Sequence, residues 1–238
     1  MWSNVISIDK GFGREIEFIL AKLQKIRHLS FAVEESRDRV FFYIASVCEM
    51  QEEVEGQVRE LLQTVFLVFM KLRFFLGALH NMDLNHANCA LICSLVHFDS
   101  EYEKGIVSRV LSETCDYAVD GLMHFRLRPL SENWEELAAL ATRLIASGGG
   151  GDIYDIASFI TGTDGAKNRI ALTDDSLFNL TVRRPVEVID LFGQPEFNLI
   201  SAIIRERPCE ILLKGAHLSA QMDRALRHIA RVTPDALI

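Results

Sequence analysis

The first third of the chain alternates hydrophobic and polar positions in a way that predicts a small sheet with one helix. Residues 5–8 indicate a short first strand, and apolar residues at helical spacing over about 14–26 indicate an amphipathic helix. Two runs rich in β-branched and aromatic residues, 29–33 and 40–45, follow on either side of a charged segment. These two runs predict a hairpin that pairs back to the first strand.

The middle of the chain is predicted to be mostly helical. A long helix from about 49 to 79 begins with acidic residues, which favour a helix N-terminus, and then becomes hydrophobic on all sides. Three further helices are expected at 85–96 with Asn85 as N-cap, at 101–118, and at 132–146 with Ser131 as N-cap. The glycine run 148–151 is the strongest linker signal, and 152–161 predicts one more helix.

The C-terminal part is richer in strands. Strands are expected at 169–173, 178–182, 186–191 and 209–213, and helices at 197–205 and at 219–232, the latter with Ser219 as its cap. The fold class is therefore α+β, with a small N-terminal strand and helix unit, a helical middle and a β-rich α/β C-terminal part. We expect a domain at 1–147 and a smaller region at 152–238, either separate or packed with the first as one domain.

The apolar stretch 61–79 is the one candidate for a membrane span. Lys71 and Arg73 fall near its middle, where each would cost about 2.5–3.5 kcal/mol on insertion scales. The uninterrupted apolar part, 65–70, is far shorter than the roughly 20 residues that a span requires. A buried core helix is the preferred interpretation.

Composition and charge narrow the functional classes. The 238 residues are 49% hydrophobic and 24% charged, which is typical of a globular protein, and the net charge of −8 disfavours binding to nucleic acid or an acidic membrane. Five cysteines, an odd number among apolar neighbours, fit buried thiols in a reducing compartment, and the first residues do not form a signal peptide. These features predict a cytoplasmic protein.

Residues 119–134 form the most informative segment. If the segment is extended, three apolar residues occupy one side and three basic residues the other: Met123, Phe125 and Leu127 alternate with His124, Arg126 and Arg128. We expect Phe125 and Leu127 to be buried. Arginine pairs bind phosphate or carboxylate groups, but ion pairing with the abundant Asp and Glu is the favoured interpretation of Arg126 and Arg128.

An anion site at the turn Gly11–Gly13 is an alternative, because this turn lies between a predicted strand and a predicted helix. The third glycine of a dinucleotide fingerprint is missing, since Ile16 occupies its position, and no Gly-Lys-Ser/Thr sequence occurs. Arg126 and Arg128 would supply the cations of such a site.

The sequence provides only a weak metal-binding signal. Cys89 and Cys93 lie between His86 and His97 at spacings of three, four and four residues, and cysteine and histidine are zinc-compatible ligands. Four ligands along one helix span about 16 Å and cannot converge on one ion. Packing of both cysteines in a core is preferred over a zinc site. No Gly-x-Ser-x-Gly motif or activated cysteine is apparent, which disfavours nucleophilic catalysis.

Three blocks of the sequence resemble the sporulation protein YtxC family. They are 121–128 with its Phe-Arg-Leu sequence, 197–204 with the following Arg207 and Pro208, and 210–213, and the similarity extends over about 85–238. The resemblance implies a cytoplasmic protein of endospore-forming bacteria that has no assigned catalytic residues. We therefore expect a non-enzymatic protein that acts through protein contacts, with a partner or with itself. The alternative is an anion- or nucleotide-binding enzyme or sensor.

Overall fold

The computed structural model describes residues 1–146, 153–161, 168–174 and 176–234. The fold is mixed α+β, as predicted. The chain forms two compact units, each built from two separate stretches of sequence: Met1–Lys71 with Asp99–Glu135, and Leu72–Phe98 with Glu136–Ile238. The glycine run predicted as a linker lies outside the described residues.

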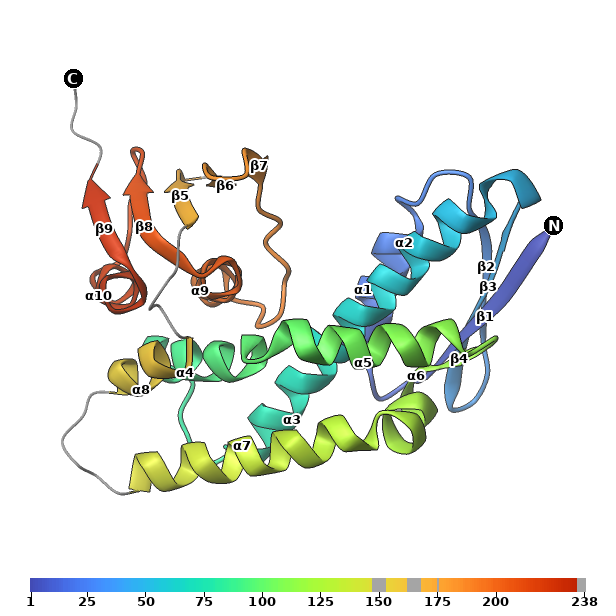
Figure 1. The fold of residues 1–238 in the computed structure, drawn as a ribbon, viewed down its shortest axis with the longest axis horizontal. Helices are drawn as coiled ribbons and strands as arrows, with labels where there is room; N and C mark the ends of the chain where they lie inside the picture. The colour runs from blue at the N-terminus through green and yellow to red at the C-terminus, as the bar shows by residue number, and fades with distance from the viewer. Residues whose placement is uncertain (147–152, 162–167, 175, 235–238) are drawn as a thin grey trace. The chain divides into compact units, whose positions relative to one another are not determined.

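The first unit contains a four-stranded sheet in the order β2-β3-β1-β4 (Figure 1). Its strands are β1 (Trp2–Asp9), β2 (Ser30–Glu35), β3 (Arg39–Ser46) and β4 (Tyr117–Ala118). Strands β1 and β3 are antiparallel, with Ile6 opposite Phe42, and β4 runs parallel to β1. Because residues directly opposite each other in an antiparallel pair lie on the same face of the sheet, Ile6 and Phe42 share a face, and both are buried.

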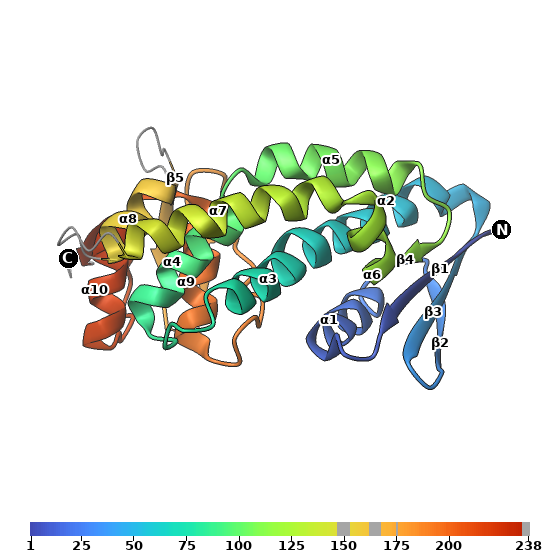
Figure 2. The ribbon, with the colours of Figure 1, turned by 90° about the horizontal axis from the view of Figure 1, so that it is seen from below.

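Helices complete the hydrophobic core of the first unit. They are α1 (Gly13–Leu23), the 3₁₀ turn η1 (Cys48–Met50), α2 (Gln51–Thr64), the π-helical segment η2 (Val65–Met70), α5 (Ser100–Ser112), α6 (Val119–Gly121), the π-helical turn η3 (Leu122–Arg126) and the first residues of α7 (Arg128–Ala146). Phe18 of α1 packs against Phe69 of η2 with ring centroids 4.7 Å apart. Figure 2 shows α1 beside the sheet.

A charged pair lies inside this hydrophobic core. The Lys71 side chain has no exposed surface, and its Nζ lies 2.7 Å from Oε2 of Glu103. The other carboxylate oxygen of Glu103 accepts a hydrogen bond from the indole N–H of buried Trp134, also at 2.7 Å. The cation that the sequence places within an apolar stretch is thus paired with a carboxylate 32 residues away.

The second unit has a five-stranded sheet in the order β7-β6-β5-β8-β9. Its strands are β5 (Asn168–Leu172), β6 (Leu177–Asn179), β7 (Arg184–Pro185), β8 (Pro208–Leu213) and β9 (Arg231–Pro234), and its helices are α3 (Lys71–Ala78), α4 (His86–His97), α8 (Ile153–Thr161), α9 (Pro195–Glu206) and α10 (Ala220–Ile229). Strands β5, β8 and β9 are parallel, whereas β6 and β7 are antiparallel additions. Helix α4 packs against α8 and α9.

Many predicted elements are confirmed. The first strand, the hairpin that pairs back to it and the helix between them occur close to the predicted positions. Asn85 and Ser219 are N-caps: their side chains accept hydrogen bonds from the backbone N–H groups of Asn88 and Met222. The continuous helical region Cys48–Ala78 is long and apolar enough to cross a membrane, and 56% of its most apolar window is buried. A single helix of this kind is weak evidence for a membrane span, because a buried core helix has the same length and composition.

Other predictions are wrong in position or type. The helix predicted at 101–118 ends at Ser112 and is followed by strand β4. Ser131 is not an N-cap, because α7 begins three residues earlier and the Ser131 hydroxyl donates to the Arg128 carbonyl. The strand expected at 186–191 is irregular chain, and β9 replaces the last turn of the predicted final helix.

Candidate functional site

The segment 119–134 is helical and not extended. Helix α6 leads into the π-helical turn η3, in which the Leu127 N–H donates to the Leu122 carbonyl five residues earlier, and α7 follows. Leu122 and Leu127 are buried and anchor the turn, so the prediction for Leu127 is confirmed. Phe125 was expected to be buried but is 77% exposed, because the wider π turn directs it away from the two anchors.

Arg126 and Arg128 each have a carboxylate partner, as the sequence favoured. An Nη of Arg126 lies 3.1 Å from Glu113, and Nε of Arg128 lies 2.9 Å from Glu132 one helical turn later. All four side chains are largely exposed to solvent. Exposed pairs of this kind contribute about 0–1 kcal/mol, so their arginines can exchange partners at little cost.

The Gly11–Gly13 turn has a local hydrogen-bonding partner. The Gly11 N–H donates to Oδ1 of Asp9 at 2.7 Å, and the adjacent Asp120 carboxylate binds Arg39 through both of its oxygens. The Gly11 amide and the Arg39 guanidinium are therefore bound by the carboxylates of Asp9 and Asp120. Two negative charges at this turn are unfavourable for binding a further anion. An anion site that combines this turn with Arg126 and Arg128 stays a prediction.

Cys89 and Cys93, for which core packing was preferred over a zinc site, are buried in α4 with their sulfur atoms 3.8 Å apart. The hydrogen bond with Cys93, together with burial, raises the pKa of the Cys89 thiol far above its ordinary range, so the protonated thiol is favoured. Within the described part of the chain, no group of three or more His, Cys, Asp or Glu side chains could hold a metal ion. Cys48, Cys115 and Cys209 were expected to be buried but are exposed.

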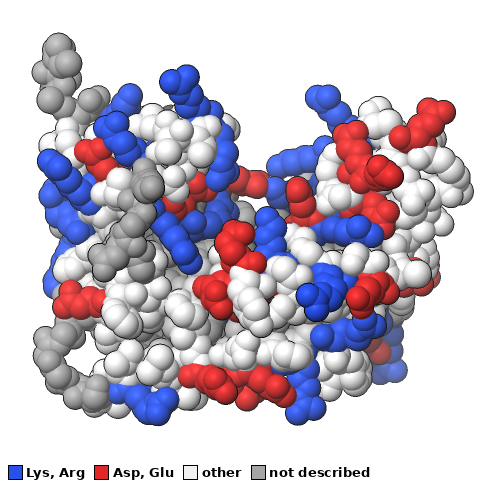
Figure 3. All heavy atoms as spheres, in the orientation of Figure 1, with Lys and Arg blue, Asp and Glu red and all other residues white. Residues whose placement is uncertain are grey.

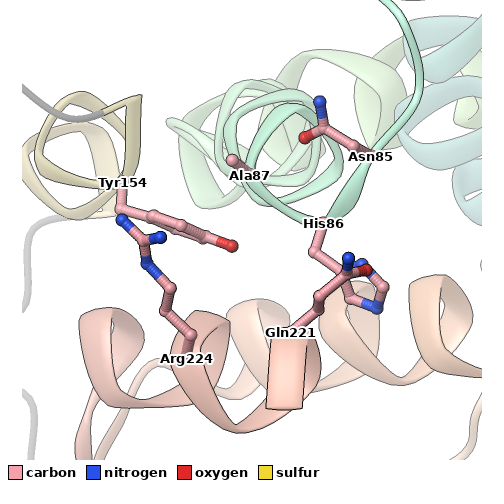
Figure 4. A pocket seen from close by; sticks show the side chains of 6 residues that line it. All are labelled: Asn85, His86, Ala87, Tyr154, Gln221 and Arg224. Atoms are coloured by element: carbon pink, nitrogen blue, oxygen red, sulfur yellow. The ribbon is translucent and has the colours of Figure 1, made fainter. Parts of the chain in front are cut away.

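A pocket of about 350 Å³ lies in the second unit at the N-terminal end of α4. Its six lining residues come from three elements or their caps: Asn85, His86, Ala87, Tyr154, Gln221 and Arg224. In Figure 4 the Tyr154 hydroxyl points into the space between α4 and α10, and Arg224 extends from α10 toward Tyr154. We call this cavity the α4 pocket.

The wall formed by Tyr154 is held in place from several directions. Its ring stacks on His228 of α10, with centroids 4.6 Å apart and planes 8° apart. The Arg224 guanidinium lies 5.6 Å from the centre of the same ring. One turn further along α8, the Ser158 hydroxyl donates to the His228 carbonyl at 2.5 Å. These contacts join α8 to α10 at the pocket wall.

The His86 wall is held by a carboxylate behind it. Nε2 of His86 lies 2.6 Å from Oε2 of Glu196 in α9, and the imidazole meets the Phe197 ring edge to face. Burial would raise the pKa of Glu196, but hydrogen bonds from His86 and Ser219 outweigh this effect and lower it. Glu196 is therefore an anion at neutral pH, and its charge is matched by local donors.

The α4 pocket was not predicted, although Asn85 was identified as a helix cap. Its lining residues are distant in sequence, and neither Tyr154 nor Arg224 belongs to a recognisable motif. Comparisons with protein-family models, curated proteins and solved structures found no match.

Proposed function

We propose that the chain acts through contact with another protein, and that His124, Phe125, Arg126 and Arg128 form the surface that it uses. We call these four residues the basic aromatic patch. The observation that carries the proposal is the 77% exposure of Phe125 in a turn whose flanking leucines are buried. Burying a large exposed aromatic side chain against a partner gains about 1.5–3 kcal/mol.

The surroundings of Phe125 have the composition of a protein interface. The His124 ring meets Phe125 edge to face at 4.7 Å, and Arg126 and Arg128 follow in sequence. Aromatic residues and arginine are enriched among the side chains that contribute most to binding. The exposed ion pairs with Glu113 and Glu132 are weak, so a partner carboxylate can replace them.

These properties define the kind of partner. It presents an apolar pocket for Phe125 with acidic groups at the rim for Arg126 and Arg128. On the face shown in Figure 3, Lys and Arg side chains lie among Asp and Glu side chains, so complementarity would be local and not a property of the whole surface. The resemblance to the YtxC family supports a role in sporulation, in the cytoplasm and without catalysis.

The test compares two exposed phenylalanines. Phe125→Ala is compared with Phe159→Ala, because Phe159 is 82% exposed in α8 of the second unit. In a spore-forming host that depends on this chain, Phe125→Ala is expected to lower the heat-resistant spore count at least tenfold, and Phe159→Ala less than twofold. Both variants should keep the parent melting temperature, since neither side chain is buried.

A photo-crosslinking amino acid at position 125 identifies the kind of contact. The expected product is a discrete adduct during sporulation that disappears when Arg126→Glu is added. An adduct between two copies of the chain, matched by a dimer in light scattering, would make the partner a second copy. Normal spore counts for Phe125→Ala, together with no adduct, would refute the proposal.

A further inference from the structure

We propose that two copies of the chain pair through strand β2, antiparallel and edge to edge about a two-fold axis. Strand β2 is at the end of the sheet order in the first unit, and five of its six residues are exposed (Figure 2). The free edge of a strand presents a row of backbone N–H and C=O groups that can pair with another strand. This surface is separate from the basic aromatic patch.

Strand β2 lacks the features that protect sheet edges. The other three edge strands in the described part of the chain are short, since β4 and β7 have two residues each and β9 has four. Strands β7 and β9 also end in proline. Strand β2 contains neither proline nor lysine and pairs with β3 without a register shift. A regular, exposed edge of this length is where a further strand adds to a sheet.

The hydrogen bonds of the hairpin show which groups of β2 face outward. The Ser36 N–H donates to the Arg39 carbonyl at 2.9 Å, so these two residues form a hydrogen-bonded pair. Such pairs alternate along antiparallel strands, and the backbone groups of Ala32 therefore face β3. By the same alternation, the backbone groups of Phe31 and Val33 point away from the sheet, where a second strand can bind them.

A two-fold axis at Ala32 brings these outward groups together. Phe31 of one copy then lies opposite Val33 of the partner subunit, and both backbone hydrogen bonds of such a pair can form. Val33 lies opposite buried Phe42 in the sheet, yet it is 45% exposed at the edge. Pairing would set an aromatic side chain beside it, and an aromatic residue opposite a β-branched one is a favourable cross-strand combination.

The charges at the two ends of β2 favour a second copy as the partner. Arg27 and His28 precede the strand, whereas Glu34 and Glu35 end it, and all four side chains are exposed. Antiparallel pairing places the basic end of each copy beside the acidic end of the other. Opposite charges therefore meet at both ends of the shared ribbon, and parallel pairing would bring like charges together.

The acidic end can take part in such contacts because its present interactions are exposed. Glu35 lies 2.9 Å from Lys10, with 66% and 38% of the two side chains exposed, and Glu34 accepts a hydrogen bond from the exposed Tyr43 hydroxyl. The hairpin turn at 37–38 adds one charge of each sign and does not change the balance. Exposed pairs of this kind exchange partners at little cost.

The first test is a disulfide at the proposed axis. Opposite residues of a non-hydrogen-bonded antiparallel pair have Cα atoms about 4.5 Å apart, which suits a disulfide. In a background with Cys48→Ser, Cys115→Ser and Cys209→Ser, Ala32→Cys should form a linked dimer with oxidised glutathione. Glu34→Cys, on the same face of β2 but roughly 13 Å from its counterpart, is the matched control and should give at least tenfold less dimer.

The second test is sedimentation of the full chain over a range of concentrations, where a dimer is expected. Val33→Pro removes an outward N–H and leaves the bonds to β3, so it should weaken the dimer at least tenfold without changing the circular dichroism spectrum. Val33→Thr keeps the N–H and should change the dimer less than threefold, and Phe125→Ala should leave it unchanged.

Several outcomes would overturn the proposal. One is a parent chain that is still monomeric at roughly 0.5 mM, near the weak limit of specific association. Equal crosslinking of Ala32→Cys and Glu34→Cys, or equal effects of Val33→Pro and Val33→Thr, would place the contact elsewhere than β2. A dimer that is lost in Phe125→Ala would assign self-association to the basic aromatic patch instead. The crosslinking result decides the question even if Val33→Pro does not fold.

Discussion

Replacing Lys71 with methionine tests the buried charge pair of the first unit. The change keeps most of the aliphatic length of the side chain and removes its charge, leaving Glu103 buried beside the Trp134 indole. Removing one member of a buried ion pair costs about 3–5 kcal/mol, because the other charge is left without compensation. We expect Lys71→Met to lower the free energy of unfolding by that amount.

A second substitution separates loss of the pair from loss of packing. In Lys71→Met/Glu103→Gln the neutral amide oxygen can still accept the Trp134 N–H, so the unpaired charge disappears while the hydrogen bond stays. The double variant should therefore recover at least about 2 kcal/mol relative to Lys71→Met. Arg128→Gln is the exposed control, since its pair with Glu132 should contribute less than about 0.5 kcal/mol.

The effect also has a defined pH dependence. Burial raises the pKa of Glu103 above its ordinary value of 4.5, while Lys71 and the Trp134 N–H act in the opposite direction. Without Lys71 the native-state pKa rises further, so the native state takes up a proton more readily than the unfolded chain. The loss of unfolding free energy in Lys71→Met should therefore shrink as the pH falls toward 4.5. It should be largest well above the native-state pKa of Glu103.

The assay is urea unfolding followed by Trp134 fluorescence in a Trp2→Phe background, at pH 5 and at pH 8. Trp134 is buried in the first unit and reports on the region that contains the pair. A loss below 1 kcal/mol for Lys71→Met at pH 8, or a deficit that does not change with pH, would refute the argument that an uncompensated charge is the cause.

Three further substitutions test other local features. Asn85→Ala should lower stability by about 1 kcal/mol, and Asn85→Asp by much less, in thermal unfolding, because the side chain of residue 85 caps α4. Asp120→Asn should make the free energy of unfolding less dependent on pH in the acid range. Burial would raise the Asp120 pKa, but the Arg39 hydrogen bonds and backbone donors lower it below 3.8. The stabilisation that Asp120 gives the parent protein is therefore present above that pH and is lost as the pH falls through the native pKa. Gly215→Ala should cost about 1 kcal/mol in urea unfolding, since the residue has φ of +71° although a Cβ meets no atom within 4 Å.

Local chemistry accounts for the elements that the sequence predicts well. The N-terminal hairpin is visible because its strands contain consecutive β-branched and aromatic residues, and its register then follows from which face is buried. Asn85 and Ser219 are recognisable as caps because their side chains act on backbone groups three residues away. Each of these features depends on residues that lie close together in the sequence, so it can be recognised without the structure.

Features that depend on distant partners could not be predicted in the same way. Lys71 finds Glu103 32 residues later, and the α4 pocket joins side chains from α8 and α10 to the start of α4. Strands β4 and β9 have two and four residues and exist because a neighbouring strand offers backbone partners. Neither periodicity nor a motif marks these positions, since the deciding contact lies elsewhere in the sequence.

The exposure of Phe125 in the basic aromatic patch could have been predicted from the sequence. The alternation of apolar and basic residues at 123–128 favoured an extended segment, and the spacing of the leucines around it was overlooked. The buried residues of the segment 119–134 are Val119, Leu122, Leu127, Leu130 and Trp134, which are separated by three, five, three and four positions. Spacings of three and four belong to an α-helix, and a single spacing of five fits one π turn, the geometry that the hydrogen bond from Leu127 to Leu122 confirms. Phe125 lies inside the spacing of five. An apolar residue at such a position is outside the buried stripe, so its exposure follows from the same pattern that buries its neighbours.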